Sequence, residues 1–278
     1  MSIKIITDST ADLLADTLNK VQVVPLTLRF GKDEYIDKVT IDNNTFYNKL
    51  IESDILPTTS QATPNDFEKV FKTIVPKDQA ICITLSSKLS GTYQSAMIAA
   101  MDYDNIYVLD SNNVTVGASI LIKQALHYVE EGLAFETIIS KLEEDKKKIV
   151  LIALVDTLEY LKKGGRISSA VAIAGTILNI KPVIAIEDGE IKILGKARGS
   201  KQGNNYLVQE IRKNGGVDFS KPVLLGYTGT NDDMLKKYIE DSKHIWQEGL
   251  DEVKYTSVGA VIGTHAGPGA IAVAFFKK

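Results

Sequence analysis

The stretch IKIITDST at residues 3–10 decides the fold class. It joins a short apolar run, rich in isoleucine, to a cluster of hydroxyl and carboxyl side chains. Such near-continuous apolar runs are typical of strands buried on both faces of a parallel sheet. The residues DST resemble a helix N-cap directly after a strand, with Asp12 three residues after Ser9. We therefore expect a strand at 3–7 followed at once by a helix at 11–19.

The same alternation continues along the first half of the chain. Similar β-branched apolar runs predict strands at 21–28, 80–85, 106–110 and 149–154. Between them, helical patterns are found at 65–73, 91–101, 117–131 and 135–148. Alternation of strand and helix predicts a mostly parallel sheet with helices on both faces.

The second half has a different pattern. The stretch PVIAIEDGEIKIL at 182–194 predicts a β-hairpin, because alternating residues flank the turn dipeptide Asp188-Gly189. Further strands are expected in PVLLGYTG and AIAVAFF, with a helix at 232–242. We therefore predict an α/β protein of two domains. Residues 1–150 would form the parallel-sheet domain, and residues 151–278 an α+β domain with some antiparallel pairing.

Composition excludes several classes of protein. The chain of 278 residues has 32 Lys and Arg against 35 Asp and Glu, a formal charge of −3. No basic excess or stripe favours a nucleic-acid partner. The N-terminus lacks a signal-peptide pattern, and no apolar run reaches the roughly 18–20 residues of a membrane span. We expect a soluble cytoplasmic protein without an internal disulfide, since Cys82 is its single cysteine.

Hydroxyl-rich segments follow most of the first-half strands. TDST follows the first strand, SSKLSGTYQS the third and DSNNVTVG the fourth, and PTTSQAT at 57–63 precedes another helix. Ligands of open α/β sheets bind at the carboxyl ends of strands, where free N–H groups at helix N-termini attract anions. Ser90-Gly91-Thr92 is the sharpest case, because glycine allows a close backbone approach. The alternative for each hydroxyl is simple helix capping.

Basic residues beside glycines suggest contacts with an anion. LEYLKKGGRIS at 158–168 places Arg166 next to two glycines between apolar runs, and Arg198 lies in GKARGSKQG. Arginine is a fork-shaped donor that suits carboxylate or phosphate. His265 is followed closely by Gly267-Pro268-Gly269, in a loop that we expect to be tight and exposed. A surface arginine without a ligand is the alternative for each arginine.

Common catalytic motifs are missing. The phosphate-loop signature is absent, and the glycines of 263–275 precede a strand rather than a helix, which does not fit a dinucleotide loop. The three histidines His127, His244 and His265 are far apart in sequence, so no metal site is expected. A hydrolase that pairs Ser90 with His265 lacks the Gly-x-Ser-x-Gly elbow, but it is kept as the alternative function.

Seven segments together resemble one family. ITDSTADL, PTTSQATPNDF, LSSKLSGTYQSA, LEYLKKGGRIS, ILNIKPVIAIEDGEI, KARG and THAGPGAIAVAF occur in the order found in the DegV family, over essentially the whole chain. The resemblance implies a FakB-type fatty-acid-binding protein. Such proteins hold a long-chain fatty acid in a tunnel and present its carboxyl group to a separate ATP-dependent fatty acid kinase. The acyl-phosphate produced feeds phospholipid synthesis. The chain would then be a substrate-binding subunit and not an enzyme, with a bound fatty acid as ligand and no cofactor.

The resemblance also implies residue roles. The carboxylate contacts of the family fall on Thr59 and Ser90, and the sequence departs from the family at Ala62, where relatives commonly carry proline. The ligand would lie between the two domains. The apolar run at 170–178, directly after Arg166, suits a wall of the sleeve, and an ordinary core helix is the alternative. The residues around phosphoryl transfer fall on Arg166, Arg198 and His265. The full set of expected ligand-binding residues is Thr59, Ser60, Ser90, Gly91, Thr92, Arg166, Thr264 and His265.

Overall fold

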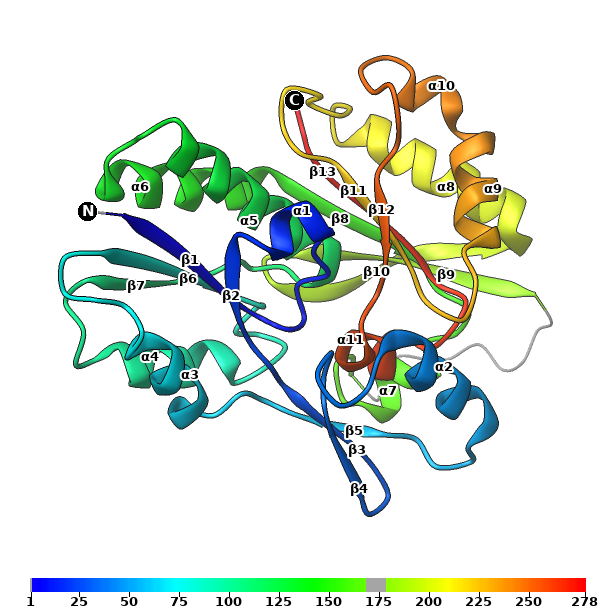
Figure 1. Cartoon of the computed structure of the whole chain (residues 1–278). Coiled ribbons are helices and arrows are strands. Elements are labelled where there is room, and N and C mark those ends of the chain that lie inside the picture. Colours follow the sequence, from blue (N-terminus) through cyan, green and yellow to red (C-terminus); the bar gives the residue numbers. More distant parts are fainter. Residues whose placement is uncertain (1, 169–178) are drawn as a thin grey trace.

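The first of three sheets is parallel. The computed structural model describes residues 2–168 and 179–278 (Figure 1). Its four-stranded sheet has the order β2-β1-β6-β7 with every pair parallel, as the sequence predicts. The strands are β1 (Ile3–Asp8), β2 (Val21–Val24), β6 (Gln79–Thr84) and β7 (Ile106–Asp110). On one face pack α3 (Pro64–Phe71) and α4 (Thr92–Ala100).

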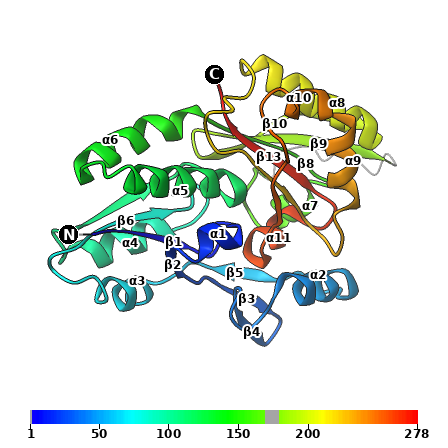
Figure 2. The same ribbon diagram turned by 45° about the horizontal axis from the view of Figure 1, so that its top comes forward.

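The second sheet is mixed and has six strands in the order β10-β9-β8-β13-β11-β12. All neighbouring pairs are antiparallel except β11 with β12. These strands are β8 (Ile149–Leu154), β9 (Ile180–Glu187), β10 (Glu190–Arg198), β11 (Leu224–Tyr227), β12 (Tyr255–Ser257) and β13 (Ile271–Phe276). Figure 2 shows the outer face covered by α8 (Gly199–Lys213), α9 (Asp233–Asp241) and α10 (Lys243–Trp246).

One helix joins the two sheets. Helix α5 (Thr115–Glu130) is buried around most of its circumference and exposes a polar stripe at Lys123, His127 and Glu130. It contacts β1 and β6 of the parallel sheet as well as β8, β11 and β13 of the mixed sheet. Helix α6 (Phe135–Asp145) packs on it and continues into a 3₁₀ turn at Lys146–Lys148. The largest apolar core therefore extends through both sheets.

The third sheet is small and was not predicted. Its antiparallel order is β4 (Asp33–Ile36), β3 (Thr27–Phe30) and β5 (Thr58–Ser60). It lies beside α2 (Asn43–Glu52), α7 (Glu159–Lys163) and α11 (Ala260–Ala266), at the bottom of Figure 1. This group closes the region where the carboxyl ends of the parallel strands meet the mixed sheet.

Three predictions about the first half were wrong in detail: two concern strands, and the third concerns the start of the first helix. The strand predicted at 21–28 splits at Pro25 into β2 and β3, which belong to different sheets. Proline offers no N–H to a ladder, and the N–H of Leu26 donates to Ser9 Oγ at 3.1 Å instead. The strand at 149–154 has the predicted bounds but belongs to the mixed sheet, not to the parallel one.

The predicted helix N-cap at residues 8–10 was also wrong. Helix α1 (Ala15–Leu18) begins later and is short. The buried carboxylate of Asp8 accepts the N–H of Thr10 at 3.0 Å and that of Leu85 at 2.7 Å. These bonds hold the chain in a turn across the end of the sheet.

The hairpin of the second half is confirmed. Strands β9 and β10 pair through a two-residue turn at Asp188 and Gly189, whose φ values of 50° and 81° are those of a type I′ turn. Over residues 2–168 and 179–278, no helix has both the length and the apolar character needed to cross a membrane.

Candidate functional site

An apolar cavity lies between the mixed sheet, the loop after β6 and α11. It contains about 940 Å³ of space free of atoms, part of which is open to solvent. The mixed sheet and α11 supply mostly aliphatic side chains, among them Leu151, Ala153, Ile184, Ile186, Val261 and Ile271. Polar side chains line the cavity as well: Thr59, Ser60, Gln61, Ser90, Arg166 and His265.

The centre of the polar group is a hydrogen bond between Thr59 and His265. Thr59 Oγ1 lies 2.9 Å from His265 Nε2. Strand β5 carries the threonine and the last turn of α11 carries the histidine. His265 is therefore not in an exposed loop, as its glycine-rich surroundings suggested, but is partly buried at a helix end.

The imidazole of His265 is held in its neutral form. Burial and the positive charge of Arg166 together lower the pKa of His265 to about 4. Its Nδ1 atom is buried without a hydrogen-bond partner among the described residues. A neutral ring that shares Nε2 with a hydroxyl provides one side of a polar cradle without adding a charge.

The basic elbow at 158–168 has a geometric explanation. Gly165 has φ +71°, a conformation that favours glycine. A Cβ on Gly164 would lie 2.2 Å from His265 Nδ1, so only glycine permits this approach. Arg166 then turns toward the loop after β6, where its Nε donates to the carbonyl of Leu89 at 3.2 Å. The two glycines thus bring Arg166 and His265 to the same end of the cavity.

The loop at Ser90 adjoins the elbow and supplies another part of the wall. Ser90 Oγ lies 2.9 Å from Thr92 Oγ1, and Gly91 is the N-cap residue of α4. The N-cap residue has no side chain to cap this helix, and Ser90 Oγ accepts the N–H of Thr92 at 3.3 Å. The following N–H groups of the first turn can serve a ligand. A Cβ on Gly91 would lie 2.1 Å from Gln61 Oε1, which shows how closely the Gln61 amide packs here.

Five of the predicted ligand residues line the cavity together. They are Thr59, Ser60, Ser90, Arg166 and His265. Gly91 and Thr92 lie just outside it, where the buried hydroxyl of Thr92 pairs with Ser90.

Two other predicted residues are placed differently. Thr264 donates its hydroxyl to the carbonyl of Ala260 at 2.9 Å, within its own helix. Arg198 is exposed at the end of β10 and does not line the cavity. Roles for these residues stay predictions. The sleeve wall predicted at 170–178 lies outside the described residues.

Sequence reasoning missed three polar residues of the lining. Gln61, whose Nε2 donates to Ser95 Oγ at 2.9 Å, lies in a segment that was noted only for its hydroxyls. Thr115 and Thr228 also line the cavity, and the Thr228 hydroxyl accepts the N–H of Ala270 at 2.7 Å. No local pattern distinguishes these threonines from ordinary ones, because their positions depend on packing between distant elements.

The geometry restricts the chemistry of the site. Ser90 and His265 make hydrogen bonds to other partners and not to each other in the described structure, and no acid orients the imidazole. The pairing required for a Ser–His hydrolase is therefore not formed. No group of metal-ligating side chains occurs within residues 2–168 and 179–278. Hydroxyl, imidazole and guanidinium groups beside an apolar cavity suit a molecule with an apolar tail and an anionic head.

Comparison with known proteins places this architecture. The model of the DegV family matches residues 2–278. A DegV domain-containing protein of Caldanaerobacter subterraneus is 37% identical over 283 residues, covering 99% of each chain. The structure of a DegV family protein from Thermus thermophilus, described as fatty-acid-binding, matches with a TM-score of 0.89 and 31% identity over 100% of both chains. A stearic-acid-binding protein from Eubacterium ventriosum matches with a TM-score of 0.87 and 30% identity, covering 100% of this chain and 99% of the other. The mixed α/β chain described above belongs to the DegV family.

Proposed function

We propose that this protein binds a long-chain fatty acid, with the tail in the apolar cavity and the carboxylate at Thr59, Ser90 and His265. The observation that carries the proposal is an aliphatic cavity whose wall carries the hydrogen-bonded pair Thr59–His265 together with the Ser90 hydroxyl. Each buried methylene contributes roughly 0.8 kcal/mol, so the tail supplies most of the affinity. The head needs partners because a buried unpaired carboxylate is costly.

Similarity to proteins of known ligand supports the same ligand class. The Thermus thermophilus protein is described as fatty-acid-binding, and the Eubacterium ventriosum protein as stearic-acid-binding. Both cover nearly the whole of this chain at 30% identity or more. The proposed ligand therefore agrees with both the chemistry of the cavity and the properties of these relatives.

We further propose that the protein is the carrier subunit of a fatty acid kinase system in the cytoplasm. A carboxylate oxygen of the bound fatty acid attacks the γ-phosphorus of ATP held by a partner kinase, the bond to ADP breaks, and an acyl-phosphate forms. The guanidinium of Arg166 would stabilise the charge that develops on the transferred phosphoryl group. In this proposal residues 1–150 and 151–278 act as two domains with the ligand between them.

A trapping assay tests this function. Protein loaded with palmitate is incubated with ATP and the fatty acid kinase of the organism that encodes it, and hydroxylamine converts acyl-phosphate to a stable hydroxamate. We expect palmitoyl hydroxamate only when protein, kinase and ATP are all present. A loaded protein that gives none, while a related DegV protein does so with its own kinase, would contradict the carrier role.

A further inference from the structure

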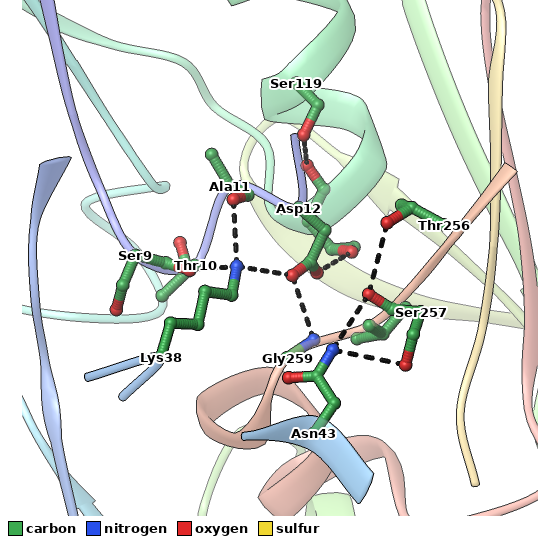
Figure 3. A network of polar contacts seen from close by, with 12 residues as sticks. Ser9, Thr10, Ala11, Asp12, Lys38, Asn43, Ser119, Thr256, Ser257 and Gly259 are labelled. Carbon is green, nitrogen blue, oxygen red and sulfur yellow. Dashed lines mark hydrogen bonds and ion pairs between the residues drawn. The ribbon is translucent and has the colours of Figure 1, made fainter. Parts of the chain in front are cut away.

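The segment that leads into α11 is held by side chains from distant parts of the chain. Asn43 Nδ2 donates to both the carbonyl and the hydroxyl oxygen of Ser257, at 3.2 Å each. Tyr47 donates its hydroxyl to the carbonyl of Val258 at 2.9 Å. Both come from α2, so two successive residues before α11 are fixed by the same helix (Figure 3 shows Asn43 and Ser257).

The third residue of this segment, Gly259, is bound by Asp12. Asp12 Oδ1 accepts the N–H of Gly259 at 2.9 Å and the ammonium of Lys38 at 2.7 Å, as seen in Figure 3. Asp12 Oδ2 accepts the hydroxyl of Thr115 at 2.6 Å. The Asp12 side chain is 1% exposed, and such a buried carboxylate needs these partners. One carboxylate thus joins the N-terminal ends of α5 and α11.

The network holds backbone conformations that are rare without glycine. Lys38 has φ 61° and Thr115 has φ 44°. Such conformations are costly and persist where the surrounding contacts impose them. Lys38 Nζ also donates to the carbonyls of Ser9 at 2.7 Å and Ala11 at 3.1 Å. Both strained residues bind Asp12 directly, which indicates that this arrangement is strongly specified.

The position of α11 determines where His265 lies. A Cβ on Gly259 would meet Lys38 Cε at 2.8 Å, and one on Gly263 would meet Tyr47 Oη at 2.5 Å. The helix is therefore seated closely at its start and along one side. Thr59, the partner of His265, comes from the separate three-stranded sheet, so their bond depends on how α11 is placed against that sheet.

We propose that Asp12 is a positioning residue, which sets the Thr59–His265 pair by fixing the start of α11 through Gly259. Asp12 does not line the cavity itself; it reaches the site through α11 and through Thr115, whose hydroxyl it accepts and which lines the cavity. The position of His265 reports on the first of these two routes. The importance of the pair for a fatty acid head group rests on the proposed function. The placement of His265 itself does not, and it can be measured without any ligand.

The test uses delipidated protein in which the histidines carry ¹³C at Cε1. In the wild type, the NMR titration of His265 should have its midpoint near 4. In Asp12→Asn, a displaced α11 exposes the ring, and we expect the midpoint to move by more than about one pH unit toward the ordinary value. The dissociation constant for palmitate should rise about tenfold, since the head group loses about one good hydrogen bond.

A matched control is available elsewhere in the chain. Asp145 is also buried, with a side chain 8% exposed, and it accepts the hydroxyl of Tyr128 at 2.7 Å and pairs with Lys221 at 3.2 Å. Its bonds lie among α5, α6 and the loop before β11, and it does not line the cavity. Asp145→Asn should lower the melting temperature as Asp12→Asn does, but should leave the His265 midpoint unchanged.

The outcomes separate positioning from mere stability. If Asp12→Asn lowers the melting temperature but leaves the His265 midpoint at the wild-type value, the positioning role is overturned. If Asp12→Asn does not fold, Tyr47→Phe is tested instead, because it removes the hydroxyl that binds Val258 in the same segment before α11. The His265 midpoint must then shift in the same direction by a smaller amount. If the midpoint shifts in Asp12→Asn but the wild-type protein binds no palmitate, the positioning role is supported and the proposed function is contradicted.

Discussion

Thr59 Oγ1 and His265 Nε2 lie 2.9 Å apart, although 206 residues separate them along the chain. The threonine comes from the small three-stranded sheet and the histidine from the helix before the last strand. The bond thus joins two elements that are far apart in the chain and meet beside the cavity. We expect it to report on both the geometry of the site and the binding of an acid.

Replacing Thr59 by valine should weaken binding of palmitate without unfolding the protein. Valine keeps the shape but removes the hydroxyl that joins His265 and would contact the carboxylate. Loss of one hydrogen bond of about 1 kcal/mol corresponds to a roughly fivefold rise in the dissociation constant, measurable by displacement of a fluorescent fatty acid. Thr58→Val, at the exposed neighbouring position of β5, is the control and should bind like the wild type.

The two glycines of the basic elbow should respond differently to alanine. Gly164→Ala places a Cβ 2.2 Å from His265 Nδ1, so α7 and α11 must separate and palmitate binding should fall at least tenfold. Gly165→Ala has open space but φ +71°, so it should cost about 1 kcal/mol of stability and leave binding intact. Chemical denaturation and ligand titration measure the two effects. Equal binding losses in both variants would contradict the close approach of Gly164 to His265.

The contribution of His265 to the stability of the ligand-free protein should fall as the pH drops from 6.5 to 4. The pKa of His265 is about 4 in the folded protein and near 6.5 when unfolded, because burial and Arg166 disfavour the charged ring. The unfolded state therefore binds the proton first as the pH falls, and about 2–3 kcal/mol of stability is lost across this window. His265→Gln should lose less stability over the same interval in urea denaturation. An identical pH dependence in both proteins would show that the ring is not protected.

The contribution of Asp37 to stability should change with pH in the opposite direction to that of His265. Its side chain is 1% exposed, and neither carboxylate oxygen has a hydrogen-bond partner among the described residues. Burial raises the pKa of Asp37 to about 6, against the opposing charge of Lys38. The folded state therefore holds a proton that the unfolded state has lost, and stability decreases as the pH rises from 3.8 through 6.

Asp37→Asn removes this titration and keeps the size of the side chain. Relative to the wild type, the variant should gain about 2–3 kcal/mol on going from pH 4 to pH 8, as measured by urea denaturation at both values. Asp33→Asn, on an exposed position of β4, is the control and should show a much smaller change. A difference between Asp37→Asn and the wild type that does not vary with pH would contradict the raised pKa.

Local signals in the sequence predicted the elements that depend only on local physics. The hairpin turn at Asp188-Gly189 was found because its backbone angles require such residues. The strands at 106–110 and 149–154 have the predicted bounds because buried apolar runs are distinctive. The strand at 149–154 was assigned to the wrong sheet, because strand pairing depends on the whole chain. Pro25 was the one overlooked signal, and it separates two strands that the apolar pattern had joined.

The candidate site was predictable mainly through family resemblance. Thr59, Ser90, Arg166 and His265 come together as that resemblance implied, although hydroxyl patterns alone left helix capping as an alternative for each serine or threonine. The anchor made by Asp12 and Lys38 was not found, because each of its bonds joins residues far apart in sequence. The pattern at residues 8–12 predicts the start of a helix, whereas the structure has a network of side-chain hydrogen bonds there.

Arg166 should be needed for turnover and not for binding. In Arg166→Ala we expect palmitate to bind with little change, since the tail supplies most of the affinity, while acyl-phosphate formation with the kinase falls at least about a hundredfold. Hydroxamate trapping measures the product. Lys163→Ala is a control from the same elbow, because this exposed lysine forms an ion pair with Glu159 and does not line the cavity. Unchanged turnover in Arg166→Ala would contradict the role proposed for the guanidinium.

The most direct measurement of the central claim is native mass spectrometry of the protein purified from bacteria, followed by lipid extraction and gas chromatography. We predict one adduct per chain, with the mass of a long-chain fatty acid, that is recovered as the free acid after extraction. Protein that carries no adduct and takes up no added palmitate would contradict the proposed function.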